Sequence, residues 1–126
     1  MKAEDLMIGD WVNLYGSPIK INIDDLGVIE RDEIYDKYDK GTHCKPIELT
    51  EEILEKNGFG FIDTSNNEYS SVWTGWWILD GLELGCCDNS KFPEFFNIAD
   101  TNVKINYVHE LQHALRLCKI EKDIIL

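Results

Sequence analysis

The segment His109-Glu110-Leu111-Gln112-His113 follows the H-E-x-x-H spacing of zinc-protease helices. Two imidazoles four residues apart share one face of a helix and can bind one Zn²⁺, while the glutamate acts as general base on the metal-bound water. The spacing therefore raises an enzymatic hypothesis, a minimal zinc-dependent hydrolase. In it His109 and His113 bind the metal, Glu110 is the base, and zinc is the cofactor.

The neighbours of this segment argue against a metal site. A catalytic zinc usually takes three protein ligands and keeps a fourth position for water. The longer zinc-protease pattern requires a glycine and a third histidine, and this chain carries Arg116 and Lys119 at those positions. Arg116 also continues the helix row of His109 and His113, and a guanidinium cannot act as a ligand. We therefore expect no metal and no catalytic residue, with both histidines on a solvated polar face.

The same segment belongs to an amphipathic helix predicted at residues 107–119. At about 100° per residue, five apolar residues fall on one broad side of this helix. They are Val108, Leu111, Ala114, Leu115 and Cys118. A helix with one apolar side lies on a hydrophobic core, so we expect these five side chains to be buried.

The N-terminal region, residues 1–30, predicts a β-hairpin. Residues 11–15 are rich in strand formers, and the turn formers Gly16-Ser17-Pro18 follow them. Beyond the turn, isoleucines at positions 19, 21 and 23 alternate with polar residues, which is typical of a half-buried strand. We expect residues 26–30 to continue the sheet and the charged segment 31–43 to form a surface excursion.

The middle of the chain predicts a short helix within residues 46–58. Thr50 is a suitable N-cap, acidic residues follow it, and Asn57-Gly58 provides a left-handed stop. Residues 59–106 then hold short apolar segments separated by turn formers, which predict a meander of antiparallel strands. The predicted strands are 69–74, 77–79, 82–86, 92–98 and 103–107.

Together these elements predict one α+β domain over residues 1–126. Its antiparallel sheet carries the short central helix and the longer C-terminal helix. Residues 6–23 also look like the opening of an SH3-like small barrel, so we expect a barrel-like sheet. Barrels of this kind often bind peptides or other partners, although a fold alone does not fix a function.

The chain is acidic, with 24 Asp and Glu against 12 Lys and Arg and a formal net charge of −12. A protein that grips nucleic-acid phosphates needs Lys and Arg clustered on one face, and the sequence contains no such cluster. We therefore expect no direct binding to nucleic acid. An alternative hypothesis makes the acidic surface a decoy that mimics nucleic acid and blocks a basic protein.

The four cysteines do not follow a disulfide framework, because Cys86 and Cys87 are adjacent and no C-x-x-C spacing occurs. Reduced thiols, the lack of an apolar leader and the lack of about 18 consecutive apolar residues predict a soluble cytoplasmic protein that does not contact membranes. A structural zinc bound by His43, Cys44, Cys86 and Cys87 is a further alternative.

Three landmarks occur in order along the chain. They are Leu6-Met7-Ile8-Gly9-Asp10-Trp11-Val12, then Pro46-Ile47-Glu48-Leu49-Thr50-Glu51-Glu52-Ile53-Leu54 with Gly58-Phe59, and finally Ile105-Asn106-Tyr107-Val108-His109-Glu110-Leu111-Gln112. In this order they resemble a family of small proteins encoded by Bacteroidetes genomes and by their phages and other mobile elements. The family motif typically reads V-H-x-L-Q-N, with Asn where this chain has His113. The resemblance implies no metal ligand and no catalytic residue.

The tryptophans Trp73, Trp76 and Trp77 are the candidate partner-binding residues. An exposed cluster of indoles usually marks a binding surface. The alternative is that at least two of them fill the core. We predict a small non-enzymatic interaction or accessory protein of phage or mobile-element origin, in which these indoles face a protein partner and His109 and His113 form a polar rim.

Overall fold

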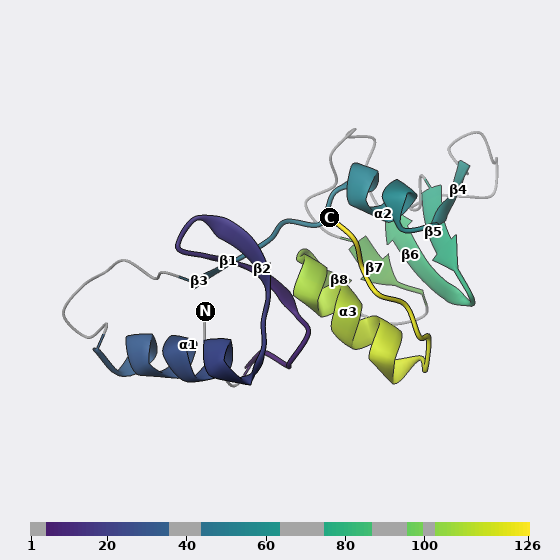
Figure 1. Cartoon of the computed structure of the whole chain (residues 1–126). Helices are drawn as coiled ribbons and strands as arrows, with labels where there is room; N and C mark the ends of the chain where they lie inside the picture. Colours follow the sequence, from purple (N-terminus) through teal and green to yellow (C-terminus); the bar gives the residue numbers. More distant parts are fainter. Residues whose placement is uncertain (1–4, 36–43, 64–74, 87–95, 100–102) are drawn as a thin grey trace. The chain divides into compact units, whose positions relative to one another are not determined.

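The computed structural model describes residues 5–35, 44–63, 75–86, 96–99 and 103–126 (Figure 1). It contains helices and antiparallel strands, so the predicted α+β class is confirmed. The chain divides into two compact units. The first unit comprises Met1–Glu48 and Tyr107–Gln112, and the second comprises Leu49–Asn106 and His113–Leu126. None of the described helices is long and apolar enough to cross a membrane.

The first unit is built on a three-stranded antiparallel sheet. β1 (Trp11–Leu14) lies between β2 (Ser17–Lys20) and β3 (Cys44–Pro46). The predicted hairpin is confirmed, but the predicted turn at Gly16-Ser17-Pro18 is wrong, because Ser17 and Pro18 already belong to β2. The loop is the two-residue turn Tyr15-Gly16, with φ of 51° and 83°. Positive φ at both positions is the pattern of a type I′ turn, whose twist matches that of the paired strands.

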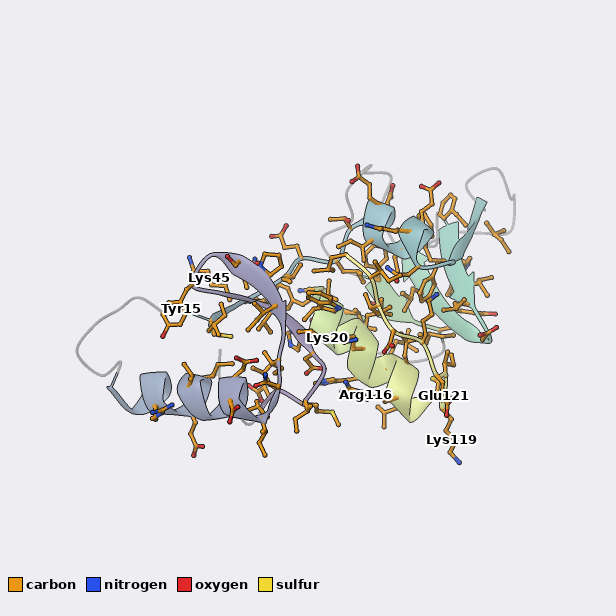
Figure 2. The ribbon with its side chains drawn as sticks, viewed as in Figure 1. Tyr15, Lys20, Lys45, Arg116, Lys119 and Glu121 are labelled. Carbon is orange, nitrogen blue, oxygen red and sulfur yellow. The ribbon has the colours of Figure 1, made fainter. Side chains whose placement is uncertain are left out.

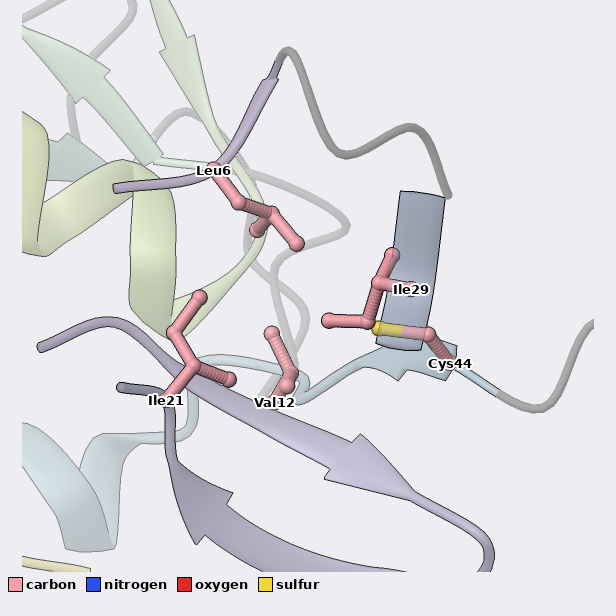
Figure 3. Packing of buried hydrophobic residues seen from close by; sticks show 5 residues of the cluster. All are labelled: Leu6, Val12, Ile21, Ile29 and Cys44. Atoms are coloured by element: carbon pink, nitrogen blue, oxygen red, sulfur yellow. The ribbon is translucent and has the colours of Figure 1, made fainter. Parts of the chain in front are cut away.

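One face of this sheet builds the hydrophobic core of the first unit. Val12 points to this face, and the side chains of the N-terminal lead, α1 and β3 gather around it (Figure 3). Each core member is at most 7% exposed. The cluster consists of Leu6, Val12, Ile21, Ile29 and Cys44.

α1 (Ile23–Tyr35) shows that two predictions are wrong, namely the strand at 26–30 and a surface excursion beginning at residue 31. The cause is a capping box that the sequence reading missed. The Asp25 N–H donates to Asn22 Oδ1 and the Asn22 N–H donates to Asp25 Oδ2, each at 2.9 Å. Ile23, the last isoleucine of the alternating run, is consequently 70% exposed. Residues 36–43 lie outside the described residues.

The second unit contains a five-stranded antiparallel sheet in the order β4-β5-β6-β7-β8. The strands predicted at 77–79 and 82–86 are confirmed, whereas residues 69–74 and 92–95 lie outside the described part of the chain. Both sheets are open over the described residues, which therefore do not form the expected barrel. The strands are β4 (Gly60–Asp63), β5 (Gly75–Leu79), β6 (Leu82–Cys86), β7 (Phe96–Ile98) and β8 (Lys104–Ile105).

The two faces of the five-stranded sheet differ in burial, because side chains alternate along each strand. The inner face belongs to the core and carries residues that are at most 6% exposed: Trp77, Leu82, Leu84, Phe96 and Ile105. The outer face carries exposed or half-buried side chains: Ile62, Trp76, Ile78, Glu83, Asn97 and Lys104.

α2 (Glu51–Lys56) is the short central helix predicted within residues 46–58. Thr50 caps its start, because Oγ1 accepts a hydrogen bond from the Ile53 N–H at 3.2 Å. Asn57 caps its end, and Gly58 follows with a φ of 87°. The predicted N-cap is therefore confirmed, while Pro46, at the beginning of the predicted range, closes β3.

Candidate functional site

α3 (Val108–Leu117) carries the H-E-L-Q-H segment and lies within the predicted range 107–119. Four of the five apolar residues predicted to be buried are buried, namely Val108, Leu111, Ala114 and Leu115. The prediction is wrong for Cys118, which is exposed. The helix ends one residue earlier, and Lys119 then adopts a φ of 58° while the Ile120 N–H donates back to the Leu115 carbonyl at 2.9 Å. Cys118 therefore lies at the very end of the helical hydrogen bonding, with its N–H bonded to the Ala114 carbonyl at 3.0 Å, where the chain turns back.

The Glu110 carboxylate makes one of the two hydrogen bonds of a capping box at the start of α3. Its Oε1 accepts a hydrogen bond from the backbone N–H of Tyr107 at 3.1 Å. Tyr107 stands immediately before the first helical residue, where backbone N–H groups have no acceptor within the helix itself. The residue that the hydrolase hypothesis makes the general base therefore stabilises the helix start.

The two histidines of the segment differ in exposure. His109 is only 8% exposed, and its ring stacks on that of Tyr107 with centroids 5.9 Å apart and planes inclined by 10°. The expectation that His109 lies on a solvated face is therefore wrong. His113 is half-buried.

Gln112 ties α3 to the N-terminal lead within the first unit. Its Oε1 accepts from the Trp11 N–H and its Nε2 donates to the Gly9 carbonyl, both at 2.8 Å. These partners lie 101 and 103 positions away along the chain. Gln112 is 7% exposed, so both ends of its amide satisfy backbone groups away from bulk water.

Metal-ligating side chains do not gather in the part of the chain that the structure describes. No group of three or more His, Cys, Asp or Glu residues there has the proximity to bind a metal ion. In the alternative zinc set, Cys44 belongs to the core of the first unit. His43 and Cys87 lie outside the described residues, as does the side chain of Cys86.

The tryptophan cluster is divided by the strand alternation of β5. Trp77 is 6% exposed and lies on the inner face, opposite Phe61 and Leu84. Trp76 is half-buried and lies on the outer face, opposite Ile62 and Gly85. Trp73 lies outside the described residues. Of the two described indoles, the one with appreciable exposure is that of Trp76.

Three apolar residues adjoin one another on the outer face, and we call them the outer apolar strip: Ile62, Trp76 and Ile78. Ile62 of β4 is 53% exposed and pairs directly with Trp76 of β5. Ile78 is half-buried and follows two residues later on the same face. Glycines stand opposite both β5 residues, Gly85 opposite Trp76 and Gly60 opposite Ile78. On its other side, Ile78 stands opposite the exposed Glu83 of β6.

Phe61 explains why β4 is apolar on its other side as well. Its ring lies 4.9 Å from that of Trp77, with the planes inclined by 42°. It also occupies the space that a Cβ on Gly75 would need. Phe61 is thus held by contacts within the second unit although it remains 49% exposed. Ile62 points the opposite way and does not share this internal role.

The sequence reading missed the tie made by Gln112. A carboxamide that binds backbone groups about a hundred positions away leaves no local pattern in the sequence, so spacing rules could not detect it.

The protein matches no family model, and no curated protein or solved structure is similar enough to it to count as a match.

Proposed function

We propose that this protein is a non-enzymatic interaction protein of the cytoplasm, and that it binds a protein partner through the outer apolar strip. It would serve as a small accessory protein of a phage or mobile element, as the three sequence landmarks suggest. The observation that carries the proposal is the pairing of exposed Ile62 with half-buried Trp76 on the face of the sheet opposite the core.

The composition of the strip supports a binding role. An aromatic ring flanked by aliphatic side chains offers a large apolar area at low conformational cost, which is typical of residues that dominate binding energy. The inner face of the same sheet already supplies the core of the second unit through Trp77 and Leu84. Burial of Ile62 by a partner would therefore add apolar contact without removing any from the core.

The position of β4 indicates how the partner binds. β4 is the first strand in the sheet order and pairs with β5 on one side. Its residues Gly60 to Ile62 are exposed and include neither lysine nor proline, the residues that commonly protect an edge. We infer that the partner lays an extended apolar segment along β4, with its side chains alternating between the strip and the opposite side.

The negative net charge of the chain indicates which residues surround the apolar segment of the partner. The chain has a net charge of −12, so a partner with Lys or Arg around its apolar segment would be steered toward the protein. We expect the association rate to fall as salt is raised, while the dissociation rate, which depends on the apolar contact, changes less.

Photo-crosslinking in cells tests this proposal. A photoreactive phenylalanine derivative replaces Ile62 in one variant and Lys104 in a matched control, which lies on the same face but on β8, away from the strip. We expect a discrete adduct with one protein at position 62 and at least a tenfold weaker adduct at position 104. The captured partner must then bind the purified protein directly, and Trp76→Ser must weaken that binding by at least tenfold.

Trp77 provides a second comparison. Trp77→Phe changes the core but leaves the outer face, so it should lower stability and leave the affinity for the partner within about threefold. Equal adducts at positions 62 and 104, or a captured partner whose affinity for the protein is unchanged by Trp76→Ser, would contradict the proposal.

A further inference from the structure

Residues 120–126, which we call the strap, leave the end of α3 and return to α2 within the second unit (Figure 1). Neighbouring side chains of the strap differ sharply in exposure. Ile124 is 2% exposed, whereas Ile125 is 55% exposed. An extended segment with one side chain buried and the next in solvent resembles a strand laid on an apolar surface.

Asn57 holds the backbone of the strap. Its Oδ1 accepts from the Ile125 N–H and its Nδ2 donates to the Ile125 carbonyl, both at 2.7 Å. One side chain thus binds both polar groups of one residue, as a paired strand would. The same Nδ2 donates to the Ile53 carbonyl at 2.7 Å, which fixes the amide, and the Asn57 residue is 0% exposed.

The end of α2 provides one more contact. The Lys56 ammonium donates a hydrogen bond to the carbonyl oxygen of Leu126. Asn57 and Lys56 bind backbone atoms, whereas Ile124 is the strap residue whose side chain is buried. We call the buried position of this side chain the Ile124 socket. The arrangement therefore recognises an extended backbone that carries one buried aliphatic side chain. The residue after it, which is exposed, can vary.

The start of the strap is far more open than its end. Residues 119–123 and Arg116 line a solvent-open pocket of about 680 Å³. Figure 2 labels Arg116 on α3 and places Lys119 and Glu121 beyond the end of the helix. Lys119 occupies the left-handed region, with a φ of 58°, which non-glycine residues adopt at a cost. These features favour release of the strap from its α3 end without unfolding the sheet.

We propose that Asn57, Lys56 and the Ile124 socket form a recognition site for an extended aliphatic peptide segment, which the strap fills in the same chain. A partner segment of the same chemistry binds there by displacing the strap. This site is separate from the outer apolar strip, so either can fail without the other.

The experiment uses the full chain and, as probe, a fluorescein-labelled peptide with the sequence of residues 120–126. Ile124→Asp in the protein should expel the strap, since it would place a charged carboxylate at a position that is 2% exposed in the wild-type chain. We expect the peptide to bind this variant at least tenfold more tightly than it binds the wild-type chain. Adding Asn57→Ala to the variant should weaken binding at least tenfold.

Two peptide variants provide matched controls. Replacing the isoleucine that corresponds to Ile124 with aspartate should abolish binding. Replacing the isoleucine that corresponds to Ile125 with serine should change the affinity less than threefold, because that side chain is exposed in the strap. Equal affinity for the wild-type chain and Ile124→Asp, or binding that persists with Asn57→Ala, overturns the proposal.

A measurement on the wild-type chain covers the case in which Ile124→Asp does not fold. The strap competes at a local concentration on the order of millimolar, so unlabelled peptide at about 10 mM should displace it. In ¹⁵N-labelled protein the Ile125 amide signal should then move toward its unfolded position while the β5 and β6 signals stay in place. An Ile125 signal that does not respond to the peptide overturns the proposal.

Discussion

Each unit of this protein uses one buried carboxamide to hold the backbone of a segment far away in sequence. In the first unit Gln112 holds Gly9 and Trp11, and in the second Asn57 holds Ile125. The two ties use the same chemistry and nearly the same distances. They differ in what else holds the bound segment.

The segment held by Gln112 is part of the sheet and the core of its unit. The Gly9 N–H donates to the Ile21 carbonyl at 2.8 Å, the Ile21 N–H donates to the Asp10 carbonyl at 2.9 Å, and β1 begins at Trp11. The strap held by Asn57 instead follows a solvent-open turn. Because the two held segments are embedded so differently, we expect the tie made by Gln112 to be permanent and the tie made by Asn57 to be releasable.

The largest effect is expected from breaking the permanent tie. Gln112→Leu leaves the Trp11 N–H and the Gly9 carbonyl without their partner in a buried place, which should lower the free energy of unfolding by about 2–4 kcal/mol. Urea denaturation measures this change in the free energy of unfolding. His113→Gln, on the same helix but half-buried, is the control and should cost less than about 0.5 kcal/mol. If Gln112→Leu lowers the free energy of unfolding no more than His113→Gln does, Gln112 does not hold the two segments together.

Breaking the releasable tie should cost less. Asn57→Ala removes the partner of both Ile125 backbone groups, but these groups can reach water if the strap detaches, so we expect a loss of about 1–2 kcal/mol. Limited trypsin digestion should cleave after Lys122 faster than in the wild-type chain. Glu55→Ala, an exposed change on α2, should leave the cleavage rate unaltered. Faster loss of the whole chain, without preference for Lys122, would argue against a releasable strap.

A smaller effect separates the capping role of Glu110 from catalysis. Glu110→Ala removes the acceptor of the Tyr107 N–H and should cost about 0.5–1 kcal/mol, whereas Glu110→Gln keeps an acceptor and should cost less. Zinc measured by elemental mass spectrometry should stay well below one per chain in the wild-type protein and in both variants. Stoichiometric zinc that disappears in His113→Asn would restore the hydrolase hypothesis.

The smallest effect compares a hairpin turn of each unit. Tyr15-Gly16 and Asp80-Gly81 both have two positive φ values, 51° and 83° in the first and 45° and 90° in the second. Asp and Asn adopt the first position of such a turn readily, whereas Tyr adopts it at an energetic cost. Tyr15→Asn should therefore stabilise the protein by roughly 0.5 kcal/mol, whereas Asp80→Asn should be neutral. A melting-temperature rise in the second variant alone would contradict this assignment.

Local signals in the sequence predicted local structure well. Thr50 and Asn57-Gly58 mark the two ends of α2, and the apolar spacing from Val108 to Leu115 gives the buried side of α3. α1 was missed because the isoleucine alternation suggested a strand, while the deciding signal was the capping box of Asn22 and Asp25. Competing local signals of this kind are resolved by which contacts form in the folded unit.

The candidate site was predictable only in part. The sequence placed Trp76 and Trp77 in one cluster, but which indole faces the core depends on the register of β5, and that is set by pairing with β4 and β6. The burial of His109 depends on its packing against Tyr107. The ties made by Gln112 and Asn57 join positions 68 to 103 residues apart, so no spacing rule could reveal them.

Native-state hydrogen exchange tests the contrast between the two ties most directly. The Trp11 and Ile125 N–H groups, each bound to a carboxamide oxygen, are followed in one sample of the wild-type chain. We expect the Trp11 amide to exchange together with the amides of β1, and the Ile125 amide to exchange well before those of β5 and β6. If Ile125 exchanges only when β5 and β6 open, the strap is a fixed part of the second unit and the account is contradicted.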